Sequence, residues 1–267
     1  MKFITRGIII KRMPYRESSA LCHCLSENHG KITIIASGCN KETSRFTGLL
    51  EPFNLLNLEL NRSPKSEIFN LNNAGIVRGY LNNVNYQTNL LIHAAAELLM
   101  QIDFTEEEGE EFFYLLDSYC AYLHNSKYHP FLVFLRFTLR LFSLLGIPLN
   151  TSCSSCNKPE VSYFTTYNNG FLCLNCYSQT TSKTGFTENC SGSYQRVAED
   201  REDYSGSTVP LSSETTEILR NIYRMDGIDR QLVTSPFIDD IKKIILMHFN
   251  SSFHKLFNLK SLKDYHV

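Results

Sequence analysis

Four cysteines in the middle of the chain have the spacing of a metal site. Cys153 and Cys156 form one C-x2-C pair, Cys173 and Cys176 form a second, and sixteen residues separate the pairs. Two residues between thiols let both sulfurs approach one ion from a tight turn, and two such turns complete a tetrahedron of thiolates around Zn²⁺. Because four protein ligands leave no open position, the pattern predicts a structural zinc site.

The remaining cysteines show no comparable pairing. We expect them to fill the core as small apolar side chains, which applies to Cys22, Cys24, Cys39, Cys120 and Cys190. An odd total of nine cysteines, four of them in a metal pattern, favours a reducing compartment over a disulfide framework.

Catalytic motifs are missing from the sequence. It contains no phosphate-binding G-x-x-x-x-G-K-[ST] loop, no H-E-x-x-H zinc motif and no G-x-S-x-G nucleophile elbow. No histidine stands two residues before a glutamate, which excludes the zinc-deaminase signature. The sequence therefore predicts a protein that is not an enzyme.

The elements that must position the cysteines change type along the chain. The first 75 residues predict five short strands, at about 3–11, 21–25, 31–36, 55–60 and 67–71. Leu56, Leu58 and Leu60 alternate with polar residues and so share one face. Five short strands with turns between them favour a small barrel or a sandwich.

Helical periodicity replaces strand periodicity after Tyr80. Helices are predicted at about 90–100, 106–123, 130–146, 214–225 and 235–257. Asn168, Asn169 and Gly170 predict the turn of a short hairpin between the cysteine pairs, whereas Ser, Thr and Gly dominate 178–215 and indicate a solvated loop. The most apolar stretch, 131–149, contains Arg136 and Arg140, so it is a buried helix and no membrane segment is expected.

Charge is distributed unevenly over a chain whose formal net charge is −1. Residues 1–80 contain eleven lysines and arginines against six acidic residues, whereas residues 81–150 contain three against eight. A basic N-terminal part beside an acidic middle indicates separate surfaces for different partners.

Several segments, taken in order, resemble the RecO family of bacterial recombination mediators. The similar residues run from Gly7 through Tyr15-Arg16-Glu17-Ser18-Ser19, His29-Gly30-Lys31, Ala36-Ser37-Gly38, Arg45-Phe46 and Leu50-Glu51-Pro52-Phe53. The helix from Phe134 to Gly146, followed by Pro148 and the four cysteines, matches too, as does a basic and aromatic C-terminal stretch from His248 to Tyr265.

The resemblance implies an α+β protein with a five-stranded N-terminal OB-fold barrel, a helical domain and a zinc-ribbon-like insertion. The domains expected on this basis are an OB-fold over 1–78, a helical domain over 79–150 and the four-cysteine zinc site over 151–178. These domains are followed by a polar flexible loop over 179–213 and by C-terminal helices over 214–267, which complete the helical domain.

The resemblance also implies a role in DNA repair and homologous recombination. Proteins of this family bind single- and double-stranded DNA, anneal complementary strands, and act with RecR to load RecA onto strands coated by single-strand-binding protein. A cytoplasmic, nucleoid-associated protein is therefore expected.

Basic residues at strand ends and in loops of the N-terminal region are the candidate DNA contacts. They are Lys11, Arg12, Arg16, Lys31, Lys41 and Arg45. Tyr15, Phe46 and Phe53 are candidates for stacking on bases, with core positions as the alternative. The loop from Ser37 to Arg45 departs from the family in containing only two basic residues.

Two other functions remain open from the sequence. The first is an adaptor whose zinc ribbon and acidic helices bind proteins, with DNA contact incidental. The second is a nucleic-acid enzyme without a familiar motif. Salt-dependent oligonucleotide binding separates mediator from adaptor, and turnover of labelled DNA with a divalent metal would reveal an enzyme.

Overall fold

The computed structural model describes residues 1–82, 84–167, 169–184, 208–223, 228, 230–254 and 257–266. The chain divides into two compact units. The first contains residues 1–137 and the short segment 259–265, and the second contains residues 138–258 and 266–267. The N-terminal strands therefore belong to the first unit and the four cysteines of the predicted metal site to the second.

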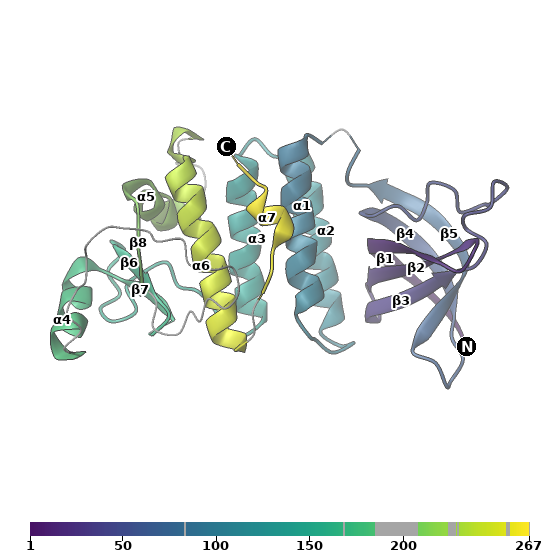
Figure 1. Ribbon diagram of the computed structural model, residues 1–267, viewed down its shortest axis with the longest axis horizontal. Coiled ribbons are helices and arrows are strands. Elements are labelled where there is room, and N and C mark those ends of the chain that lie inside the picture. The colour runs from purple at the N-terminus through teal and green to yellow at the C-terminus, as the bar shows by residue number, and fades with distance from the viewer. Residues whose placement is uncertain are drawn as a thin grey trace. The chain divides into compact units, whose positions relative to one another are not determined.

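Five strands at the N-terminus close into a barrel (Figure 1), namely β1 Lys2–Tyr15, β2 Ser19–Ser26, β3 Gly30–Ala36, β4 Asn54–Asn61 and β5 Ile68–Gly79. Their order is β1-β2-β3-β5-β4, and β4 pairs with β1 to complete the ring. Only the β3–β5 pair is parallel. This closed five-stranded arrangement is the predicted OB-fold barrel, and the α+β fold class is confirmed.

Alternating side chains give the barrel its core. In β3, Ile32, Ile34 and Ala36 are buried, while the residues between them are partly exposed. Leu56, Leu58 and Leu60 of β4 are fully buried, as their spacing predicts. The closed ring therefore places one face of every strand in a shared apolar interior.

Three helices follow the barrel, namely α1 Tyr86–Gln101, α2 Gly109–Asn125 and α3 Pro130–Leu144. The Asn85 side chain caps α1 by accepting the Thr88 N–H at 2.8 Å. Before α2, the Thr105 N–H donates to the Glu108 carboxylate at 2.8 Å, and the Glu108 N–H donates to the Thr105 hydroxyl at 3.3 Å. These two bonds close the turn over 106–108, and α2 itself begins at Gly109, three residues after the predicted start.

The barrel and α2 meet through a close backbone contact. A Cβ atom added to Gly109 would lie 2.3 Å from the Cα atom of Gly30, so only glycine fits there. Beside this contact, the Arg6 guanidinium donates to the Glu27 carboxylate, and the Tyr114 hydroxyl donates to the same carboxylate at 2.6 Å. The β2–β3 side of the barrel is therefore covered by helix.

The second unit contains a small sheet with the order β7-β6-β8, built from β6 Tyr163–Thr165, β7 Gly170–Leu172 and β8 Thr208–Pro210. Its helical elements are α4 Leu174–Thr184, α5 Ser213–Asn221, the 3-10 turn η1 Arg230–Leu232 and α6 Ser235–Phe253. The antiparallel β6–β7 pair is the predicted hairpin, with Asn169 in its turn at φ 44°. Asn168 lies outside the described residues.

Helix ends differ from the sequence prediction where single residues change the backbone. α6 ends at Phe253 rather than near 257, because His254 takes a left-handed conformation at φ 49°. Gly146 at φ 72° likewise follows the end of α3. No described helix has both the length and the apolar character needed to cross a bilayer.

The segment 179–213, predicted as a flexible loop, has regular structure at both described ends. α4 continues to Thr184, and β8 adds a strand to β6. Residues 185–207 lie outside the described residues, so the loop stays a prediction there, as do the domain boundaries expected from the sequence. The short helix α7 Lys260–Lys263 returns to α1 in the first unit (Figure 1).

Candidate metal centre and nucleic-acid interface

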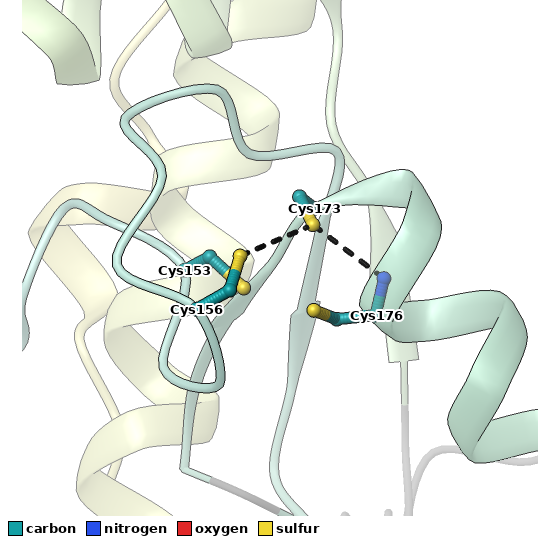
Figure 2. Close-up of side chains that lie close together, drawn as sticks. All are labelled: Cys153, Cys156, Cys173 and Cys176. Atoms are coloured by element: carbon teal, nitrogen blue, oxygen red, sulfur yellow. Dashed lines mark hydrogen bonds between the residues drawn. The ribbon is translucent and has the colours of Figure 1, made fainter.

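The four cysteines of the predicted metal site converge at one point (Figure 2). Cys153 forms an isolated bridge with Phe171 of β7, Cys173 follows directly after β7, and Cys176 lies in the first turn of α4. The four sulfur atoms all lie within 4.8 Å of one another. Cys153 and Cys173 are buried, whereas Cys156 is exposed.

A tight turn shapes the first cysteine pair. The Asn157 N–H donates to the Cys153 carbonyl and the Cys153 N–H donates to the Lys158 carbonyl, each at 2.8 Å. Asn157 takes the left-handed conformation at φ 58°, which asparagine tolerates better than most residues. The turn thus brings Cys153 and Cys156 to the same side.

Electrostatics at the cluster favour a bound cation. Burial opposes ionisation of Cys153, but backbone N–H donors outweigh burial and lower its pKa to about 6. Hydrogen bonding to Cys173 and Cys156 raises the pKa of Cys176 to about 12. One thiolate therefore forms readily, and four thiolates at this distance need a cation to neutralise them.

The geometry fits the ion that the spacing predicts. A tetrahedral site with Zn–S bonds of about 2.3 Å places neighbouring sulfurs about 3.8 Å apart. The Sγ atoms of Cys156 and Cys173 lie 3.7 Å apart (Figure 2). Four soft thiolate donors are the ligand set of structural zinc sites. The cluster is thus able to hold a metal ion without reorganisation of the backbone.

A buried histidine anchors the hairpin that carries Cys173. The His248 ring, on α6, contacts Asn169 Oδ1 through Nδ1 and the Ile147 carbonyl through Nε2, both at 2.8 Å. Ser251 also donates to Asn169 Oδ1 at 2.9 Å. Burial lowers the pKa of His248, and the hydrogen bond to the Ile147 carbonyl opposes this shift.

The other cysteines lie where core filling places them. Cys22, Cys24 and Cys39 are buried in the barrel core, and Cys120 is buried in α2. Burial raises the pKa of Cys22 to about 11, and that of Cys24 further still. The thiols of Cys22 and Cys24 are therefore neutral at physiological pH. Cys190 lies outside the described residues.

Three of the six basic residues predicted to contact DNA are hydrogen-bonded to other residues of the first unit. Lys31 is engaged inside the first unit, because its ammonium donates to the Ile102 carbonyl at the end of α1 and lies 4.6 Å from the Phe104 ring centroid. Arg45 donates to the Asn72 carbonyl. Arg12 donates to Glu51 at 3.1 Å and also to Asn40.

The remaining candidates, Lys11, Arg16 and Lys41, are exposed. Arg16 lies in the β1–β2 turn at φ 54°, and its guanidinium is 5.1 Å from the Tyr15 ring centroid. Lys41 lies in the β3–β4 connection. Five of the six basic candidates thus lie on β1 or on the β1–β2 and β3–β4 connections.

Two of the three aromatic candidates are core residues. Phe46 is 7% exposed and Phe53 is 0% exposed, and the Phe53 ring packs edge-on against His93 at 4.7 Å between centroids. Their surroundings leave no face for a base. Tyr15 is partly exposed.

Sequence reasoning missed a groove beside these basic residues. It lies between β1, β2 and α1, has a volume of about 490 Å³, and brings His23 and His93 to the same site. Seventy positions separate these two histidines in the chain, and neither belongs to a motif. Only the fold brings them together.

Comparison with known proteins identifies the family. The model of the recombination protein O N-terminal domain matches residues 1–80, and the model of its C-terminal domain matches residues 84–222. A DNA repair protein RecO from Thermodesulfovibrio yellowstonii is 24% identical over 255 residues, covering 93% of this chain and 92% of the relative. One from Myxococcus xanthus is 30% identical over 175 residues, covering 64% of this chain and 70% of the relative. This chain belongs to the RecO family.

Proposed function

We propose that this chain is a DNA repair and recombination mediator. It binds DNA, anneals complementary single strands, and assists loading of the recombinase RecA, together with RecR, onto strands covered by single-strand-binding protein. It acts without catalytic turnover, in the cytoplasm and at the nucleoid. Membership in the RecO family and relatives named as DNA repair proteins support this role.

The observation that carries the proposal is the closed N-terminal barrel with exposed basic residues on β1 and in the β1–β2 and β3–β4 connections. Residues 1–80 hold an excess of five positive charges, and a basic OB-fold tracks a phosphate backbone through such residues. Lys41 is exposed in the long β3–β4 connection, so it is accessible to a phosphate backbone.

The metal site supports the same proposal indirectly. We propose that Cys153, Cys156, Cys173 and Cys176 hold one structural Zn²⁺ that fixes the β6–β7 hairpin and the start of α4. Because all four ligands come from the protein, the ion contributes stability rather than chemistry.

An annealing assay tests the mediator function. Two complementary oligonucleotides are mixed with and without single-strand-binding protein, and duplex formation is followed by fluorescence. We expect the chain to accelerate annealing under both conditions, and Lys41→Glu to slow it because the charge in the β3–β4 connection is reversed. Annealing that is no faster with the protein than without it would refute the proposal.

A protein-binding adaptor is the second candidate, favoured by the acidic surface before and at the start of α2. Glu106, Glu107, Glu110 and Glu111 are all exposed there. An adaptor would bind oligonucleotides only weakly. Its partner binding would weaken when these four residues are replaced by glutamine, while annealing would stay unchanged.

A further inference from the structure

A groove in the first unit lies between the barrel and α1 and is separate from the metal site. Its lining residues come from β1, β2, the β3–β4 connection and α1, and its volume of about 490 Å³ lies within the range of small-ligand sites. Lys11 and Arg12 contribute positive charge, while Pro52, Ala96 and Met100 contribute apolar surface. Basic and apolar walls together suit a ligand with a phosphate and a ring.

The groove offers a cation that the described part of the chain leaves unpaired. Lys11 is exposed and forms no hydrogen bond or ion pair with any described residue. It lies directly opposite His23 in the antiparallel β1–β2 pair, so both side chains face the groove. A phosphate here would meet Lys11 without displacing a protein carboxylate.

Arg12 strengthens the same wall. Its partner Glu51 is 53% exposed on its side chain, and an ion pair of this kind holds weakly in water. The Nε–H of Arg12 is buried without an acceptor among the described residues. The guanidinium is therefore held in place by Glu51 and Asn40, while its Nε–H donor remains available for a hydrogen bond.

One carboxylate also lines the groove, and its hydrogen bonds are made elsewhere. Glu97 of α1 accepts the Ser261 hydroxyl at 2.9 Å and the Ser261 N–H at 3.2 Å, which ties α7 to α1. The carboxylate oxygens of Glu97 therefore bond to α7, whereas Lys11 and Arg12 lie on β1, on another wall of the groove. The two strands and the helix give the groove a basic wall and a helical wall.

A second hollow continues the groove toward the β3–β4 connection. It has a volume of about 350 Å³, shares Arg12 and Pro52 with the groove, and reaches Asn40 beside Lys41. Arg12 and Pro52 therefore lie between the two hollows, and the second hollow is also lined by the carboxylate of Glu51, the partner of Arg12.

We propose that the groove between β1, β2 and α1 holds one nucleotide of a single-stranded DNA, with its phosphate on Lys11 and Arg12 and its base on the apolar wall. The strand then continues through the second hollow to Lys41. This inference rests on the proposed function, because it specifies where on the barrel and α1 the strand lies.

The two histidines report occupancy of the groove. Burial lowers the pKa of both His23 and His93, assisted at His23 by Lys11 and opposed at His93 by Glu97. The charged and titratable groups around them are Lys11 and Arg12 on β1 and Glu97 on α1. A bound phosphate stabilises the imidazolium form, so the pKa of each ring rises on binding and affinity increases as the pH falls.

Histidine ring signals in a proton NMR titration of the intact protein test the proposal. His23→Gln and His93→Gln assign the two signals, and His248 in the second unit serves as the internal control. Oligothymidylate should shift both groove signals and raise both pKa values, without moving His248. Lys11→Ala should remove these shifts and reduce the salt slope of binding by about 0.7. Lys65→Ala, an equal charge change in the β4–β5 connection, should leave both unchanged.

The outcomes separate the inference from the proposed function. If oligothymidylate binds but leaves the His23 and His93 signals in place, the groove is empty and the inference fails while the function stands. If it does not bind at all, the proposed function fails. Thymidine monophosphate tests whether a free nucleotide, rather than a strand, occupies the groove. If thymidine monophosphate shifts the His23 and His93 signals and oligothymidylate does not, a strand site is overturned.

Discussion

The backbone contact between Gly30 of the barrel and Gly109 of α2 gives a sharp test of the fold. Replacing Gly109 by alanine adds a Cβ atom 2.3 Å from the Gly30 Cα and 2.7 Å from the Gly30 nitrogen. Carbon atoms pack at about 3.5–4.0 Å, so the two backbones must separate by more than about 1 Å. Both contacting atoms are backbone, so no side-chain rotation relieves the clash.

The size of the effect follows from two opposing contributions. Overpacking of a tight contact costs about 1–3 kcal/mol, whereas replacing glycine by alanine in a helix returns at most about 1 kcal/mol. We expect Gly109→Ala to lower the free energy of unfolding by about 1–2 kcal/mol. Separation of the two backbones should also weaken the neighbouring contact between Glu27 and Tyr114.

Urea denaturation followed by circular dichroism measures this change. Gly75→Ala is the matched control, because Gly75 lies in β5 and a Cβ atom there has no neighbour within 4 Å. The control should differ from wild type by no more than about 0.5 kcal/mol. Equal stability of Gly109→Ala and Gly75→Ala would show that the barrel does not meet α2 through this contact.

Three further predictions concern the metal, the barrel and turnover. Reduced protein prepared without chelator should contain about one zinc per chain by elemental analysis. Cys153→Ser should lose metal and stability, while its folded fraction keeps its DNA affinity. Wild-type protein without metal would contradict this prediction. Hydrogen bonding to Arg6 lowers the pKa of Glu27, so Glu27 stabilises the fold above its unfolded pKa of about 4.3 and this advantage disappears as the pH falls through the folded pKa. Acid titrations of wild type and Glu27→Gln should therefore converge at low pH, and a gap that widens would refute the assignment. ATP hydrolysis should be absent, and an ATPase rate abolished by a point mutation in this chain would overturn that expectation.

Local patterns predicted the strands of the barrel and the convergence of the four cysteines, whereas closure into a barrel rather than a sandwich was implied only by the resemblance to the RecO family. Alternating leucines in β4 predict a one-sided strand, and the spacing of Cys153, Cys156, Cys173 and Cys176 predicts their convergence because each pair needs only a tight turn. Both patterns act over a few residues, where backbone geometry decides the outcome.

The features that the sequence did not predict depend on contacts between residues far apart in the chain. Nothing near Lys31 indicates that its ammonium would bond the end of α1, and the left-handed His254 that ends α6 belongs to no sequence pattern. Phe46 and Phe53 are aromatic residues in a basic region, yet both are buried by barrel closure. The groove depends on α1 packing beside β1 and β2, which brings His93 close to His23.

Binding of single-stranded DNA as a function of salt tests the central claim most directly. Each phosphate contact contributes a slope of about −0.7 to the dependence of log affinity on log salt. Replacing Lys41 and Arg45 together by alanine should weaken binding to all sequences alike and flatten the slope by about 1–1.5 units. Replacing the exposed Lys260 and Lys263 of α7 removes the same charge and should leave the slope near its wild-type value. Equal effects of the two double substitutions would contradict a DNA surface on the barrel.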